Sequence, residues 1–144
     1  MSSLPRVQLA INVTDVDAAV DFYSRLFGAE PHKRRPGYAN FALDTPPLKL
    51  VLIENAGAAG SLNHLGVEVA GTTEVSDAQQ RLADAGLASR EEANVVCCHA
   101  RQDKVWVSDP DGAAWEVYTV LDDAPELAMA LGADTATDSV CCAG

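Results

Sequence analysis

Hydrophobic and polar residues follow the same order twice along the chain, and this order predicts an internal repeat. In the first half, apolar and polar residues alternate over 6–13, which is typical of a strand. An apolar stripe of helical period follows at 16–26. Thr14 or Asp15 can cap the first turn of this helix, and Gly28 can end it. Two more strands are expected in this half, at residues 38–43 and 48–54.

The second half repeats this pattern after a linker of small residues at 56–61. A strand is expected at 63–69, and a helix is expected at 73–85, where Gly86 ends it. Three strands follow, at residues 94–99, 103–108 and 114–120. The second half therefore has the order βαβββ, and we interpret the first half as the same module, although only two of its last three strands have a visible pattern. The sequence thus predicts an α+β fold built from two βαβββ modules.

The composition limits the classes of protein that this chain can belong to. It has 144 residues, of which 48% are hydrophobic, so we expect one globular domain with a core. This domain should span 1–121, with modules at about 6–55 and 62–121, and a tail should follow at 122–144. The net charge of −11 argues against nucleic acid or an anionic membrane as a partner. With no visible signal peptide or membrane-spanning run, we expect a cytoplasmic protein.

All four cysteines occur as adjacent pairs, Cys97-Cys98 and Cys141-Cys142. Adjacent Cα atoms lie about 3.8 Å apart, whereas a relaxed disulfide needs about 4.4–6.8 Å, so neither pair favours a disulfide. Two reduced thiolates can instead close a chelate ring on one soft atom. A strand would turn one of Cys97 and Cys98 out of the core, which favours a binding role over simple burial. For the second pair, a capture clamp and incidental thiols are both open.

Polar residues also occur inside strands that are otherwise apolar. Gln8 in the opening strand of the first half aligns with His64 in the opening strand of the second. Glu116 lies between two apolar neighbours that point to the opposite face, and a buried carboxylate is costly unless it is paired or binds a metal. Lys104 has two interpretations, as a solvated hairpin residue or as part of a site.

The repeat, together with four short motifs, resembles the vicinal-oxygen-chelate superfamily, which includes glyoxalase I, bleomycin-resistance proteins and extradiol dioxygenases. The resemblance covers about residues 6 to 121. Its motifs are the opening strand with Gln8, the helix end at 22–28, the segment 63–66, and the turn at 109–112 that leads to Glu116. The resemblance implies that both modules form one cupped mixed sheet around a divalent metal. It also implies that Gln8, His64 and Glu116 bind this metal.

Residues 94–106 resemble a narrower branch, which contains the ArsI carbon–arsenic lyases and the cadmium-induced protein CadI. This resemblance implies Fe(II), O2 and oxidative cleavage of the C–As bond of a small-molecule trivalent organoarsenical. Cys97 and Cys98 match the substrate-binding cysteines, and His99 and Lys104 are further candidates for substrate contact. The valence of arsenic agrees, because As(III) with one bond to carbon has two bonds left for sulfur.

The implied iron site departs from the common set of two histidines and one carboxylate, because Gln8 stands in a histidine-like position. An amide oxygen is neutral and binds metal more weakly than imidazole does. We therefore expect modest affinity for iron and exchange with other divalent metals.

Two other functions stay open at this point. One is a cytoplasmic protein that sequesters Cd(II) or another soft metal without catalysis. The other is a glyoxalase-like isomerase or drug-binding protein, which leaves the cysteine pair unexplained. The sequence does not decide between a monomer and a homodimer. The basic segment 32–35 is expected to be a solvated loop, whose Arg34 and Arg35 could attract an anionic ring substituent of an aromatic arsenical.

Overall fold

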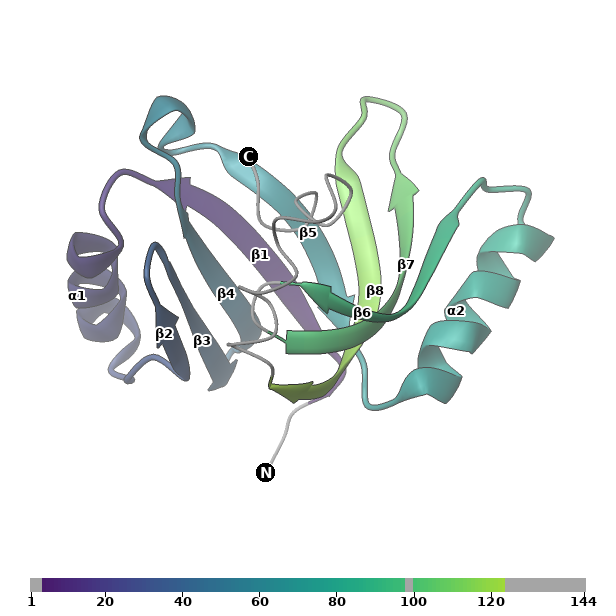
Figure 1. Ribbon diagram of the computed structural model, residues 1–144, viewed down its shortest axis with the longest axis horizontal. Helices are drawn as coiled ribbons and strands as arrows, with labels where there is room; N and C mark the ends of the chain where they lie inside the picture. The colour runs from purple at the N-terminus through teal and green to yellow at the C-terminus, as the bar shows by residue number, and fades with distance from the viewer. Residues whose placement is uncertain (1–3, 98–99, 124–144) are drawn as a thin grey trace.

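The computed structural model describes residues 4–97 and 100–123, except for the side chain of Cys97. Two helices pack against one strongly curved sheet of eight strands (Figure 1). The first half of the chain contains β1 (Arg6–Val13), α1 (Val16–Phe27), β2 (Lys33–Arg35), β3 (Tyr38–Asp44), β4 (Pro47–Glu54) and the 3-10 helix η1 (Ala56–Ala58). The second half contains β5 (Leu62–Glu68), α2 (Thr72–Asp84), β6 (Arg90–Cys97), β7 (Ala100–Ser108) and β8 (Ala114–Asp123).

The strand order shows the repeat directly. The sheet runs β2-β3-β4-β1-β5-β8-β7-β6, so the second module repeats the first in reverse order about the central β1–β5 pair. β1 and β4 are parallel, as are β5 and β8, whereas all other neighbours are antiparallel. The predicted α+β fold, with two βαβββ modules in one mixed sheet, is therefore confirmed.

Both predicted helices are present, and local chemistry explains the ends of α1. The carboxylate of Asp15 caps this helix by accepting hydrogen bonds from the backbone amides of Asp17 and Ala18. Gly28 ends it with a φ of 63°, a left-handed conformation that costs a residue without Cβ little. α1 is one residue longer than predicted, and α2 begins and ends one residue earlier than predicted.

Four strands differ from the sequence prediction by three residues or more. β7 begins at Ala100 instead of residue 103, and β8 ends at Asp123 instead of residue 120. β2 lies in the basic segment that was expected to form a loop, where it pairs with β3 at the edge of the sheet. Its three charged residues have no hydrophobic alternation, so no strand pattern is visible in the sequence. β6 begins at Arg90 instead of residue 94, because a bulge with Asn94 at φ 55° continues the strand across a break in register.

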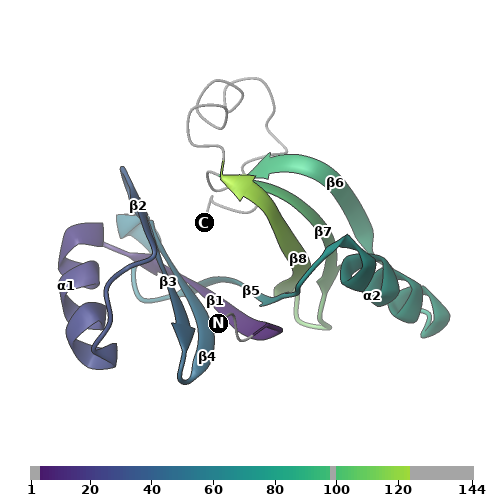
Figure 2. The same cartoon turned by 90° about the horizontal axis from the view of Figure 1, so that it is seen from below.

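The two faces of the sheet have opposite chemical character. On the convex face, Leu9 and Ile11 of β1 pack with Val20 of α1 in an apolar core, and α2 covers the second module in the same way. Figure 2 shows the two modules as the walls of a cup, with both helices on the outside. The concave face carries polar side chains that are nevertheless buried, namely Gln8, Asn40, Lys49, His64, Glu68, Gln102, Lys104 and Glu116.

Most of the predicted tail lies outside the described residues. β8 continues to Asp123, and residues 124–144, which include Cys141 and Cys142, lie outside the described residues. The domain boundary at residue 121 and the role of the second cysteine pair therefore stay predictions. Neither described helix is long and apolar enough to cross a membrane.

Candidate functional site

Three polar side chains from both modules meet in the middle of the concave face. β1 supplies Gln8, β5 supplies His64 and β8 supplies Glu116, and each residue is at most 4% exposed. Gln8 Nε2 donates to Glu116 Oε2 at 2.6 Å, and His64 Nε2 lies 3.0 Å from the same oxygen. The three residues predicted as metal ligands are therefore neighbours in space.

Gly66 gives these side chains the space to meet. It lies on β5 directly between Gln8 of β1 and Glu116 of β8. A Cβ at this position would lie 2.8 Å from the backbone oxygen of Glu116 and 2.9 Å from its Cγ. Both distances are too short for real contacts, so a glycine is required for the close approach of Glu116 across β5.

Lys104 neutralises the charge of Glu116. Its Nζ lies 2.7 Å from Glu116 Oε1, and the two side chains are only 1% and 3% exposed. The contact is an ion pair without an aligned hydrogen bond, because Oε1 accepts none from the described residues. Burial raises the pKa of Glu116, but the charge of Lys104 and the hydrogen bond with His64 outweigh burial and lower this pKa to about 2. Glu116 is therefore ionised at neutral pH.

Hydrogen bonds from neighbouring residues orient the other two donors. Tyr118 donates its hydroxyl to Gln8 Oε1 at 2.6 Å. His64 Nδ1 lies 2.8 Å from Asn63 Oδ1, and Asn63 is itself oriented by donating Nδ2 to Asn12 Oδ1 at 3.0 Å. Because an amide oxygen can only accept, this contact holds a proton on His64 Nδ1. The hydrogen bond from His64 to Glu116 therefore needs a second proton on the ring, at Nε2, and without it the Nε2 lone pair faces the carboxylate.

The donor set fits a divalent metal ion. A lone pair and a carboxylate oxygen that face each other at 3.0 Å need a cation between them, either a proton or a metal. This spacing is also about that of adjacent ligands around an ion with bonds of about 2.1 Å. The described residues contain no group of three His, Cys, Asp or Glu side chains that could hold a metal ion, so a metal at this site would need Gln8 as its third donor. Tyr118 can partner either end of the Gln8 amide, because a phenol both donates and accepts.

The repeat accounts for the number of donors. Gln8 on β1 corresponds to His64 on β5. Two residues further along, Ala10 on β1 then corresponds to Gly66 on β5. Ala10 pairs with Val51 on β4, and Gly66 pairs with Glu116 on β8, so Val51 stands where the second module has Glu116. One module therefore has an apolar residue where the other has a carboxylate. The two modules therefore supply three candidate donors instead of four.

The cavity around the donors has a volume of about 100 Å³, and Ala100, Gln102 and Lys104 of β7 line one side of it. Cys97, the last residue of β6, pairs in register with Ala100 of β7, which lines the cavity. The strand end that carries the predicted cysteine clamp therefore borders the cavity. Cys98, His99 and the side chain of Cys97 lie outside the described residues, so the clamp itself stays a prediction.

The structure adds residues that the sequence analysis missed and corrects one interpretation. Lys104 is not a solvated hairpin residue, because it is 1% exposed and paired with Glu116. Tyr118 and Arg6 also line the cavity, and neither was singled out from the sequence. The signal for both was the period of two along a strand, since each lies two residues from a predicted ligand and shares its face.

The fold and this site define a class of protein that comparison with known sequences also identifies. The model of the glyoxalase, bleomycin resistance protein and dioxygenase superfamily matches residues 6–117. The chain belongs to this superfamily, as the resemblance in the sequence implied.

Two curated relatives lie in the branch that the sequence resembled. A trivalent organoarsenical cleaving enzyme of Thermomonospora curvata is 55% identical over 140 residues, which cover 96% of this chain and 89% of the relative. The cadmium-induced protein CadI of Mycobacterium tuberculosis strain H37Rv is 54% identical over 144 residues, which cover 98% and 95%. Among solved structures, the Mn(II)-bound glyoxalase from Novosphingobium aromaticivorans supports the fold, with a TM-score of 0.59 at 19% identity over 86% of this chain and 42% of that chain.

Proposed function

We propose that this protein cleaves the carbon–arsenic bond of trivalent organoarsenicals, with Fe(II) held by Gln8, His64 and Glu116 and with O2 as co-substrate. The observation that carries the proposal is that the cysteine-bearing end of β6 borders the same cavity as the three donors. The relatives named for organoarsenical cleavage, at 55% and 42% identity, support this substrate class.

The cysteine pair selects the substrate by valence. Cys97 and Cys98 take two of the three bonds of As(III), so the arsenic atom that they hold keeps one bond to carbon. The organic group then points from the end of β6 into the cavity, toward the donors. His99 and the buried Lys104 are candidates for contacts with the substrate at this end.

The chain's own residues prepare the reaction in two ways. Lys104 keeps Glu116 ionised, and Asn63 leaves the lone pair of His64 on Nε2. Bound Fe(II) supplies the activation of O2. For methylarsenite, the C–As bond breaks, one O2 is consumed, and formaldehyde and arsenite form. Carbon loses the four electrons that O2 gains, and arsenic stays trivalent.

One assay tests this function. Reduced, Fe(II)-loaded protein is incubated with methylarsenite under air and under nitrogen, and inorganic arsenite is measured. We expect release under air only. Cys97→Ser and Cys98→Ser should each abolish release while the protein still binds Fe(II), because the thiols hold the substrate and not the iron. Full activity in both variants would contradict the clamp.

A second function has its own support, since CadI proteins are 54% identical to this chain. In this alternative, a cytoplasmic protein sequesters Cd(II) or another soft metal through its thiolates and catalyses no reaction. It predicts tight stoichiometric binding of the soft metal and no release of arsenite under air or nitrogen. The same assay therefore separates the two functions.

A further inference from the structure

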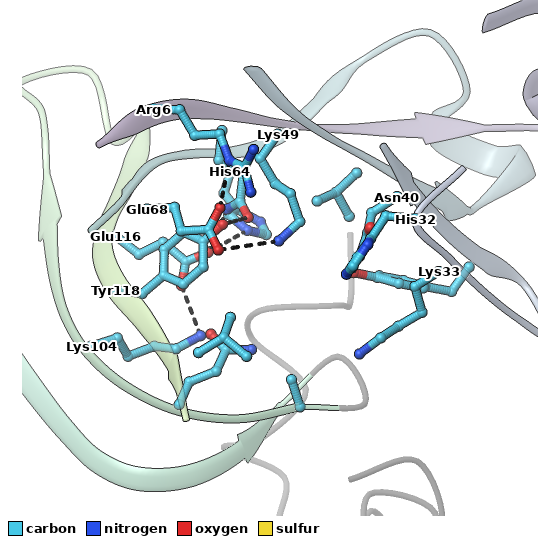
Figure 3. Close-up of a pocket in the computed structure, with 16 residues that line it drawn as sticks. Arg6, His32, Lys33, Asn40, Lys49, His64, Glu68, Lys104, Glu116 and Tyr118 are labelled. Atoms are coloured by element: carbon cyan, nitrogen blue, oxygen red, sulfur yellow. Dashed lines mark hydrogen bonds and ion pairs between the residues drawn. The ribbon is translucent and has the colours of Figure 1, made fainter. Parts of the chain in front are cut away.

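A second polar cluster lies in the cavity beside the three donors (Figure 3). Glu68 of β5 forms an ion pair with Arg6 Nε at 2.8 Å and another with Lys49 Nζ at 3.6 Å. All three side chains are only 9% exposed. Inside the cavity two cations share one buried carboxylate, whereas the second carboxylate near Arg6, that of Asp44 at 3.9 Å, is 57% exposed to solvent.

Lys49 is the cation of this cluster with the weaker contact to Glu68. Its Nζ lies 3.6 Å from Glu68 Oε2, longer than a typical hydrogen bond, and 5.9 Å from the centre of the Tyr118 ring. An ammonium has three N–H donors, so these two contacts leave donors for the acceptor atoms of a bound anion. Burial lowers the pKa of Lys49, the charges of Arg6 and Lys33 lower it further, and Glu68 raises it. These features indicate a place for an additional anion.

The opposite wall of the cavity adds one more lysine at the same end. His32 and Lys33 stand across the cavity from Glu68 in Figure 3. The pKa of His32 is lowered, first by burial and then by the charges of Lys49 and Lys33, so the neutral imidazole is favoured. Arg34, which the sequence suggested for an anionic substituent, instead pairs with Asp17 on the outside. The cations that line this end of the cavity are therefore Lys49, Arg6 and Lys33, and the sequence suggested none of them for binding an anion.

The position of the cluster relates it to the donors. Arg6 precedes Gln8 by two residues on β1, and Tyr118 follows Glu116 by two residues on β8, where it pairs with Glu68. Two residues along a strand span about 6.6 Å. A methyl group at the donors cannot reach across this distance, whereas a phenyl ring with an acidic group opposite its arsenic atom can.

From this geometry we propose that Lys49, supported by Arg6, forms an anion-binding subsite for an acidic substituent on the organic group of the substrate. The proposal rests on the proposed function, because the cysteine clamp places the arsenic atom. It makes acid-bearing aryl arsenicals a preferred substrate class over unsubstituted aryl ones.

The test compares two ligands that differ only in charge. The dissociation constants of 4-carboxyphenylarsenite and phenylarsenite are measured by calorimetry with reduced, Fe(II)-loaded protein under nitrogen, so that no turnover is required. We expect the natural protein to bind the carboxylate ligand about tenfold more tightly. Lys49→Met should bring this ratio close to one, whereas Arg25→Met, which removes an exposed cation on α1, should leave it unchanged.

A second variant tests the sign of the effect. Glu68→Gln keeps Lys49 and removes its competing carboxylate, so the preference for the carboxylate ligand should increase. An equal ratio in the natural protein and in Lys49→Met would overturn the subsite, as would a natural protein with no preference. An intact preference without arsenite release under air would refute the proposed function and support the subsite. Release of arsenite under air, together with an unaltered ratio of the two dissociation constants in Lys49→Met, would support the proposed function and refute the subsite.

Discussion

Gly66 and Lys104 solve two problems that arise when a carboxylate is buried at the centre of a sheet. Gly66 provides the space, because any Cβ there would collide with the backbone and side chain of Glu116. Lys104 provides the charge, because its ammonium compensates the burial of Glu116. Sequence reasoning found Glu116 because a carboxylate stands out in an apolar strand. It could not assign Lys104, because a lysine in a hairpin strand is usually solvated.

Replacing Gly66 should damage both stability and metal binding. In Gly66→Ala, Glu116 must shift away from the added methyl group, so we expect the free energy of unfolding to fall by about 1–3 kcal/mol. Affinity for Fe(II) or Mn(II) should fall as well. Urea unfolding and metal titration measure the two effects. Gly57→Ala is the control, because its Cβ would meet only Asn55 Oδ1 at 4.0 Å. Unaltered metal affinity in Gly66→Ala would contradict the role of this glycine.

Among the elements, the β6–β7 hairpin is joined to α2 through Asp103. One oxygen of Asp103 accepts from the backbone amide of Asn94 at 2.6 Å, and the other accepts from Thr72 Oγ1 at 2.7 Å. This carboxylate therefore joins the bulge of β6 to the first residue of α2. Neither the bulge nor this contact was predicted, since a positive φ and a contact between distant segments leave no periodic pattern in the sequence.

Removing this link should loosen the hairpin without disturbing the donors. In Asp103→Ala, we expect faster amide hydrogen exchange over residues 90–97 and a loss of about 1 kcal/mol in the free energy of unfolding. Exchange followed by mass spectrometry measures the first effect. Asp77→Ala removes an exposed carboxylate from α2 and serves as the control. Equal exchange in both variants would argue against Asp103 as the link.

In the molecule as a whole, the candidate metal site spans the junction of the two modules. Gln8 belongs to the first module, whereas His64 and Glu116 belong to the second. The modules already share the β1–β5 ladder. A metal bound to all three donors would add a second connection between them, and binding free energy of this kind increases the stability of the native state.

Metal should therefore stabilise the entire fold. Added Mn(II) or Fe(II) at about 100 times its dissociation constant should raise the free energy of unfolding by about 2.7 kcal/mol, with a matching rise in Tm. A chelator should reverse the effect. Calorimetric unfolding of the natural protein, Gln8→Ala and the exposed control Gln80→Ala measures it. The rise should shrink in Gln8→Ala and persist in Gln80→Ala. An equal rise in both would exclude Gln8 as a ligand.

The sequence by itself determined the repeat, both helices and most strands. Each of these follows from local rules, namely the strand period of two, the helical period and helix caps. The three candidate donors were implied by the family resemblance, and their role as metal ligands stays a prediction. Only the tertiary structure placed Lys104 against Glu116, Gly66 between Glu116 and Gln8, and Lys49 beside Glu68. These pairings depend on the curvature of the sheet and on register between strands far apart in the chain. Buried lysines, in particular, are decided by the carboxylates that surround them, which local sequence does not contain.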